Sequence, residues 1–316
     1  MTSNTMAQED ITLPLTIVAK AFLILEKDIE ATCADGENWA WDGTTLTIGL
    51  DGQNSDFSNY TAIQIGTASN PFANETAKIA ITNGTETTIE TASSLATNYG
   101  IKIYGSAEFT SAEGLKSDAG VLTVKGGESL QANSYGIWAT SDLTFSGPTV
   151  NGYGGLTHTR MAMSVGIYAD SNFEIKSGDI YGQGGSTTLE ADPNYGGMIM
   201  YISCGAGCGT PDSGDTKIKS TFKMSGGSYS GRSEKCLAGY YLGAGAAGSL
   251  STFDIDTDLF ELDMCTIEFN EAWGYCAYWT PDEPVEESEP AQFHLRNVLI
   301  LLQGVENVAP TGESWE

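Results

Sequence analysis

A short unit, a glycine followed by an apolar–any–apolar triplet, recurs along the chain and restricts the possible folds more than any other feature. The copies lie at residues 100–103, 136–139, 166–169, 197–200, 239–242 and 274–277, with an earlier copy at 62–65. Each copy is followed by an apolar–polar–apolar triplet, such as 143–145 or 173–175, and then by a shorter strand such as 179–181. Three period-two strands with glycine-containing corners therefore recur about every 30 to 40 residues.

This order of strands predicts a parallel arrangement. In each triplet the flanking residues point to one side of the strand and the middle residue points to the other. The inward positions hold Ile, Leu, Val, Phe, Met or Ala, and one unit alone cannot bury them, so neighbouring units must stack. The sequence predicts an all-β protein, a right-handed single-stranded parallel β-helix with three strands per coil. A two-layer sandwich is the alternative, and it would need hairpin turns between adjacent strands.

The repeats divide the chain into residues 1–38, an N-terminal segment that caps the stack, residues 39–303, the β-helix, and residues 304–316, a C-terminal tail. The apolar stretch 11–25 contains Pro14 and Lys20 and is too short and interrupted to cross a bilayer. Acidic residues precede it, whereas a signal peptide begins with basic ones. If the protein is secreted, we expect that its signal sequence is not part of this chain.

Three stretches interrupt the repeat and are predicted to project from it. Residues 186–194 and 204–220 are rich in Gly, Ser, Thr and Asp and are expected to be loops. Residues 281–290 combine prolines with glutamates and are expected to be a solvated excursion.

The charge balance narrows the partners. Fourteen basic residues stand against 41 acidic ones, for a net charge of −27. Such a surface repels nucleic acid and anionic lipid, so neither nucleic-acid binding nor membrane insertion is expected. It attracts calcium, and the alternating Asp254, Asp256 and Asp258 are the candidate ligands. This run lacks the glycine and terminal glutamate of a helix–loop–helix calcium loop, so a plain polar loop is the alternative. The charge itself also fits a secreted protein kept soluble.

Six cysteines are present, an even number that permits disulfides. Cys204 and Cys208 flank Gly-Ala-Gly and would close a small bridge if that segment is a loop. The alternative is that the cysteines are buried thiols, which behave as small apolar side chains.

The stretch 39–48, Trp-Ala-Trp-Asp-Gly-Thr-Thr-Leu-Thr-Ile, followed by Tyr-Gly-Ile and Leu-Thr-Phe units, resembles bacterial surface β-helix proteins labelled as carbohydrate-binding domain proteins, of the pectate-lyase-like superfamily. The resemblance covers about residues 39–303. It implies a secreted, often calcium-binding protein that attaches to polysaccharides, generally without cleaving them. The missing signal peptide, the long loops and the cysteines depart from that pattern.

The sequence gives little support for catalysis. A β-helix lyase needs a Lys or Arg base beside calcium, and the three arginines, Arg160, Arg232 and Arg296, form no cluster. A glycosidase needs two carboxylates at a set separation, whereas Glu174 and Glu261 are expected in different coils. The sequence therefore favours a protein that is not an enzyme, with a polysaccharide lyase or hydrolase as the less favoured alternative.

The register predicts a binding strip on the outer side of the first strand of each coil. The outward position reads Lys102, Trp138, Tyr168, Ile199, Tyr241 and Cys276. Aromatic rings pack on the C–H faces of sugars, so the predicted carbohydrate-binding residues are Trp138, Tyr168, Tyr241, Tyr104, Tyr201 and Tyr278. A projecting loop that covers these rings is the alternative.

These features predict an extracellular or cell-surface protein that binds a polysaccharide, either a neutral glycan or pectin held through calcium. A structural or adhesive cell-surface protein that acts through protein–protein contacts is the second hypothesis.

Overall fold

A computed structural model describes residues 20–91, 98–112, 118–129, 133–158, 161–186, 200–209, 220–233, 240–246, 250–256, 259–263, 266–267, 269–270, 274–275, 292–296, 299–303 and 306–307. Only the backbone is described from residue 233 onward and at residues 161 and 200–202. The described chain is all-β, with one short 3-10 turn at Leu50–Gly52. No helix in this part of the chain has the length and apolar character needed to cross a membrane.

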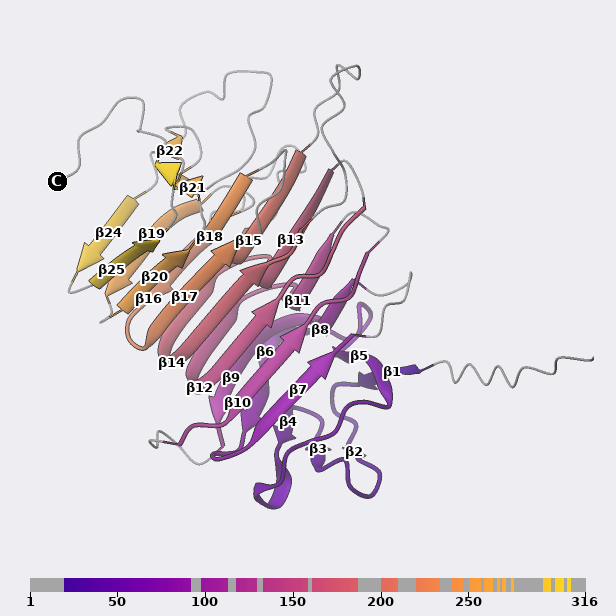
Figure 1. The fold of residues 1–316 in the computed structure, drawn as a ribbon. Helices are drawn as coiled ribbons and strands as arrows, with labels where there is room; N and C mark the ends of the chain where they lie inside the picture. The colour runs from indigo at the N-terminus through magenta and orange to yellow at the C-terminus, as the bar shows by residue number, and fades with distance from the viewer. Residues whose placement is uncertain are drawn as a thin grey trace, which may run out of the picture.

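The first sheet consists of parallel strands that come from successive repeats (Figure 1). In spatial order they are β1 (Ala21–Leu25), β5 (Tyr60–Ile65), β8 (Tyr99–Ile103), β11 (Ser134–Ala139), β13 (Met161–Ala169), β15 (Met200–Cys208) and β18 (Tyr240–Ala246). Each strand pairs with the next copy of the same unit, so the predicted parallel pairing is confirmed.

The second sheet has two arms, which share the long strands β12 (Leu143–Tyr153) and β14 (Phe173–Gly184). The first arm contains β4 (Thr45–Ile48), β6 (Phe72–Ile81), β9 (Gly105–Ser111), the start of β12 and β14, β16 (Ser220–Met224), β19 (Leu250–Asp256) and β24 (Gln292–Arg296). The second arm contains β7 (Glu86–Glu90), β10 (Val121–Lys125), the end of β12 and β14, β17 (Ser228–Ser233), β20 (Leu259–Asp263) and β25 (Leu299–Gln303). The chain visits the first sheet, the first arm and the second arm in turn.

The bend between the two arms coincides with glycines in a left-handed backbone conformation. Gly147 in β12 has φ 111° and Gly178 in β14 has φ 100°, values that favour glycine because it has no Cβ. The pairing of β12 with β14 shifts register between Phe145 and Thr149, on both sides of Ser146. The recurrent glycine after the second triplet therefore turns the strand from one arm into the other.

Side chains from both sheets alternate between the interior and the surface, as predicted. Four phenylalanines of the first arm form a buried stack, with ring centroids 5.2, 5.5 and 4.7 Å apart from Phe109 to Phe145, Phe173 and Phe222. In the first sheet, Ile101, Ile137 and Ile167 lie in register and are fully buried. Stacking of like residues on neighbouring strands is the repeated element of this core.

The glycine of the repeating unit lies where the first sheet meets the second arm. A Cβ added to Gly136 would lie 2.5 Å from the Gly166 carbonyl oxygen and 2.7 Å from the Tyr153 amide nitrogen. One added to Gly152, on the second arm, would lie 2.6 Å from the same Gly166 oxygen. The two backbones approach too closely there for a side chain, which explains the glycine at positions 136 and 166 of the repeating unit.

A row of buried serines also joins the first sheet to the second arm. Ser134, Ser164 and Ser203 are in register on neighbouring strands of the first sheet. The Ser164 hydroxyl donates to the Gly155 carbonyl at 2.6 Å and accepts from the Gly185 amide at 2.9 Å. The Ser134 hydroxyl accepts from the Gly155 amide at 2.9 Å, so consecutive repeats are linked by buried hydrogen bonds.

An antiparallel meander closes the N-terminal end. It consists of β2 (Ala31–Thr32), β3 (Trp39–Trp41) and β4, and β4 then pairs in parallel with β6. The predicted boundary between residues 38 and 39 lies inside this meander. Of the predicted capping stretch 11–25, residues 11–19 lie outside the described residues, and β1 joins the first sheet as its terminal strand.

One carboxylate ties this meander to the first sheet. Glu37 accepts hydrogen bonds from Trp39 Nε1 at 3.1 Å and from the Tyr60 hydroxyl and Asn59 Nδ2 at 3.0 Å each. Burial alone would raise the pKa of Glu37, but these hydrogen bonds and one from the Ala34 amide outweigh it and lower the pKa. The carboxylate is therefore held in its charged form.

The predicted loops have mixed outcomes. Residues 204–208 belong to β15, so the prediction of a loop from 204 to 220 is wrong at its start. Most of 186–194 and all of 281–290 lie outside the described residues. Parallel pairing continues past residue 303, because β26 (Glu306–Asn307) pairs with β21 (Thr266–Ile267).

Candidate functional site

The predicted aromatic strip forms in the register only from Lys102 to Tyr168, and Tyr168 is not at the surface. Lys102, Trp138 and Tyr168 form one row across β8, β11 and β13, as expected. Tyr168, however, is only 1% exposed, and its hydroxyl donates to the Gly209 carbonyl oxygen. Burial raises the pKa of this phenol well above its ordinary value. The prediction that Tyr168 is an exposed stacking surface is therefore wrong.

Beyond Tyr168 the row contains glycine. Gly207 and Gly245 occupy the positions where Ile199 and Tyr241 were predicted. Tyr241 pairs instead with Ser203, and it precedes Gly243 in the strand whereas Gly245 follows it.

The two remaining tyrosines of the predicted strip do not extend it. Tyr201 pairs through its backbone with Ala162, which is buried, and Tyr278 lies outside the described residues. Cys276, predicted at the end of the row, also lies outside them.

Trp138 is already engaged within the protein. Tyr135 stacks on its ring at 4.8 Å between centroids, and the Lys102 ammonium lies 3.7 Å from its centroid. Its indole N–H donates to Asp170 Oδ1 at 2.8 Å. The same ammonium lies 4.5 Å from the ring centroid of Tyr104, which is also a residue of the predicted strip. We name Lys102, Tyr104, Tyr135, Trp138 and Asp170 the lysine–aromatic cluster. Their mutual contacts leave little of the Trp138 indole for a sugar ring.

A second outward surface lies on the second arm, where sequence reasoning placed no site. Its first row is Thr88, Thr123, Asn151, Tyr181 and Ser230, and its second row is Glu90, Lys125, Tyr153, Gln183 and Arg232. We name this surface the tyrosine face, because the rings of Tyr153 and Tyr181 lie side by side in it, 5.5 Å apart with an interplanar angle of 51°. Both tyrosines are half-buried.

Contacts within the tyrosine face orient its polar side chains. Asn151 Nδ2 donates to Thr123 Oγ1 at 3.2 Å, and the Tyr181 hydroxyl donates to Gln183 Oε1 at 2.8 Å. The Asn151 amide has a second N–H and an oxygen besides this bond. The face thus presents amides, hydroxyls and rings on neighbouring strands.

The sequence did contain a signal for Tyr153. The alternation that begins at Thr149 continues through Val150 and Asn151, and Gly152 takes the next inward position. Because glycine adds no apolar side chain, the apolar–polar alternation in the sequence ends at Asn151, and Tyr153 is not identified as an outward residue.

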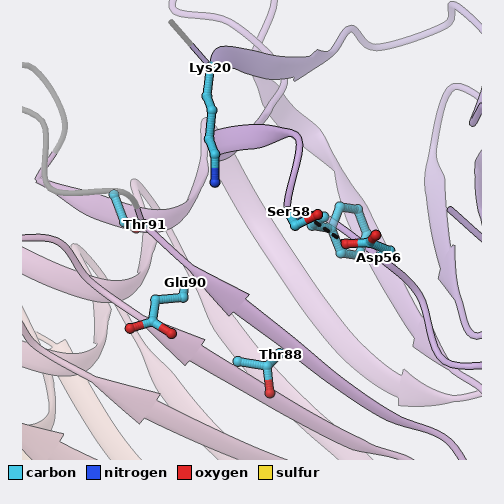
Figure 2. A pocket seen from close by; sticks show the side chains of 7 residues that line it. Lys20, Asp56, Ser58, Thr88, Glu90 and Thr91 are labelled. Atoms are coloured by element: carbon cyan, nitrogen blue, oxygen red, sulfur yellow. Dashed lines mark hydrogen bonds between the residues drawn. The ribbon is translucent and has the colours of Figure 1, made fainter. Parts of the chain in front are cut away.

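A pocket of about 480 Å³ lies at one end of the tyrosine face, lined by Lys20, Asp56, Phe57, Ser58, Thr88, Glu90 and Thr91. Figure 2 shows Lys20 extending into the space between Asp56 and Ser58 on one side and Glu90 on the other. Hydrogen bonds from the Ser58 backbone and side chain, together with the charge of Lys20, lower the pKa of Asp56. The pocket therefore contains an ionised carboxylate and an ammonium group.

The predicted calcium ligands lie in a different place. Asp254 and Asp256 are in β19, where the register sets Asp254 between Lys223 and His294, and Asp256 beside Arg296. Asp258 lies outside the described residues. Among residues whose side chains are described, no group of three or more metal-ligating side chains converges.

The candidate acid–base pair is not a pair. Glu174 is in the first arm, where Lys223 donates to it at 3.0 Å, while Glu261 is in β20 of the second arm. Cys204 and Cys208 likewise fit the alternative of buried thiols. Cys204 and Cys208 lie four positions apart on one strand, too far for a bridge, and the Cys204 thiol donates to the Ala206 carbonyl.

Comparison of the chain with protein-family models, curated proteins and solved structures gave no match. The candidate sites are therefore the outer surfaces of the two sheets and the pocket.

Proposed function

We propose that this chain folds as a right-handed parallel β-helix with three strands per coil, and that it binds a neutral polysaccharide on its tyrosine face without cleaving it. The β-helix is supported by the order in which the chain visits the first sheet and the two arms, and by the in-register parallel pairing of successive repeats. An extracellular location is part of the same proposal and is supported by the acidic composition.

The observation that carries the proposal is the Tyr153–Tyr181 ring pair, to which each row contributes one ring beside its amide and hydroxyl side chains. Tyrosine offers an apolar ring for sugar C–H groups and a phenol for hydroxyls. Neighbouring strands are about 4.8 Å apart, so a linear glycan lying across them would meet the side chains of successive strands at regular intervals. Asn151 stands beside the rings, where its amide can bond sugar hydroxyls.

The charges on the face and on the whole protein favour a neutral glycan. Among the row residues whose side chains are described, Glu90 is the one carboxylate, and it is ion-paired with Lys125 at 3.4 Å. On β20 the register continues the two rows with Glu261 beside Ser230 and Asp263 beside Arg232, so that end of the face is acidic. A polyuronate would meet a net charge of −27 and would need calcium to bridge it.

Affinity electrophoresis in gels containing barley β-glucan, xylan, galactomannan or pectin, with and without calcium, tests the proposal. We expect retardation by at least one neutral polysaccharide, and at least about tenfold weaker binding for the Tyr153→Ala, Tyr181→Ala double variant, which corresponds to about 1.4 kcal/mol. Tyr104→Ala, which changes an aromatic residue of the lysine–aromatic cluster, is the matched control and should bind as the parent does.

Two results would contradict the proposal. Retardation lost on Tyr104→Ala but retained in the double variant would move binding to the lysine–aromatic cluster. Absence of retardation by every polysaccharide would overturn polysaccharide binding itself.

A further inference from the structure

The tyrosine face ends abruptly at β7. On one edge β7 pairs with β10 through its backbone. Along the other edge runs the segment that contains Asn54 and Ser55. Asn54 Oδ1 accepts from the Glu86 amide at 2.8 Å, and the Ser55 amide donates to Thr87 Oγ1 at 3.1 Å. The segment before β5 therefore occupies the position that a further strand of the face would take.

The same segment forms a wall at the end of the two rows. Thr88 and Glu90, the first residues of the rows, line the pocket from the face, while Asp56 and Ser58 line it from the covering segment. Lys20, just before β1, extends into the space between them (Figure 2). A chain that follows the rows thus reaches the pocket at the edge of β7.

The size and chemistry of the pocket suit a single end unit of a glycan. Its volume of about 480 Å³ is within the usual range for small-ligand sites. Phe57 lines the pocket but is only 4% exposed, and Trp39 stacks on its ring with centroids 6.1 Å apart. The Lys20 ammonium and the Asp56 carboxylate supply a donor and an acceptor for sugar hydroxyls.

We propose that this pocket holds the terminal sugar of the polysaccharide bound on the tyrosine face, so that the protein recognises chain ends. The inference rests on the proposed function and adds to it that binding increases with the number of ends. Internal segments of a long chain would contact only the tyrosine face.

The test uses whichever polysaccharide of the panel retards the protein, either intact or shortened by partial acid hydrolysis, at equal mass concentration. Hydrolysis multiplies the ends without changing the mass of sugar. We expect the shortened chains to compete for the protein at least about tenfold better per unit mass. Borohydride reduction of the shortened chains then tells which end is bound, because it alters only the reducing end.

A pocket variant separates the two proposals. Ser58→Trp places a large ring at the exposed rim of the pocket, so it should abolish the preference for short chains while the intact polysaccharide still binds. Ala68→Trp, in an exposed turn away from the pocket, is the matched control and should keep the preference. Equal binding of intact and shortened chains by the parent would overturn end recognition and leave the tyrosine face standing. Absence of any binding would overturn both proposals.

Discussion

The indole N–H of Trp138 donates to Asp170 Oδ1 at 2.8 Å, so the lysine–aromatic cluster contains a partly buried carboxylate. Burial raises the pKa of Asp170, although the Trp138 hydrogen bond and the Lys102 charge act in the opposite direction. The folded protein therefore binds the Asp170 proton more tightly than the unfolded chain does. The charged carboxylate costs stability once the pH exceeds this raised pKa.

Asp170→Asn should consequently become more stable relative to the parent as pH rises. The amide keeps an oxygen acceptor for the indole N–H and removes the charge. Thermal unfolding between about pH 3 and about pH 7 should show the melting-temperature difference, variant minus parent, increasing with pH. Asp179→Asn, at an exposed position, should show no such trend. A difference that falls with rising pH would contradict the raised pKa.

The phenylalanine stack predicts graded costs of substitution. Phe173 is fully buried between Phe145 and Phe222, so Phe173→Ala should lower the free energy of unfolding by about 3 to 5 kcal/mol. Thr144, one residue before Phe145 and pointing outward, should cost less than about 0.5 kcal/mol when changed to Ala. Chemical denaturation measures both, and similar costs at the two positions would contradict the register.

The close approach of the first sheet to the second arm predicts that Gly152→Ala is strongly destabilising. Its Cβ would meet the Gly166 carbonyl oxygen at 2.6 Å, and backbone cannot give way as a flexible side chain can. We expect a loss of about 3 kcal/mol, the upper part of the range for overpacking. Gly36→Ala serves as control. Its Cβ would have no atom within 4 Å, so only its positive φ should cost stability, about 1 to 2 kcal/mol. The reverse order of the two costs would show that the backbones are further apart.

Stabilisation by calcium stays a prediction, now with a more specific test. Millimolar calcium should raise the melting temperature relative to chelator, because an ion at about 100 times its Kd adds about 2.7 kcal/mol to the folded state. If Asp254 is a ligand, Asp254→Asn should reduce the effect and Asp179→Asn should not. Equal melting temperatures with calcium and with chelator would rule out stabilisation by calcium.

The sequence predicted the parallel pairing and the buried positions wherever large apolar residues alternate with polar ones, as in 143–145 and 173–175. The prediction failed in β15, where Ala206 and Cys208 fill inward positions and Gly207 an outward one. Because these residues are all small, their polarity and size do not distinguish the two sides of the strand. The sequence therefore does not distinguish Gly197 from Gly205 as the start of the unit. The burial of Tyr168 agrees with the alternative of a covering segment, because its hydroxyl donates to Gly209 within the stretch 204–220. The sequence alone did not decide between that alternative and an exposed strip.

The register between neighbouring repeats also makes the length of the molecule adjustable in whole steps. Leu143 is paired with both Ala107 and Phe173, so residues 143–172 form one complete interval between equivalent positions. Removal of that interval would bring Phe173 opposite Ala107 and shorten the tyrosine face by one strand spacing, about 4.8 Å, together with Tyr153. Duplication would lengthen it by the same step. On the proposed function, the number of repeats would set the length of glycan that the tyrosine face can contact.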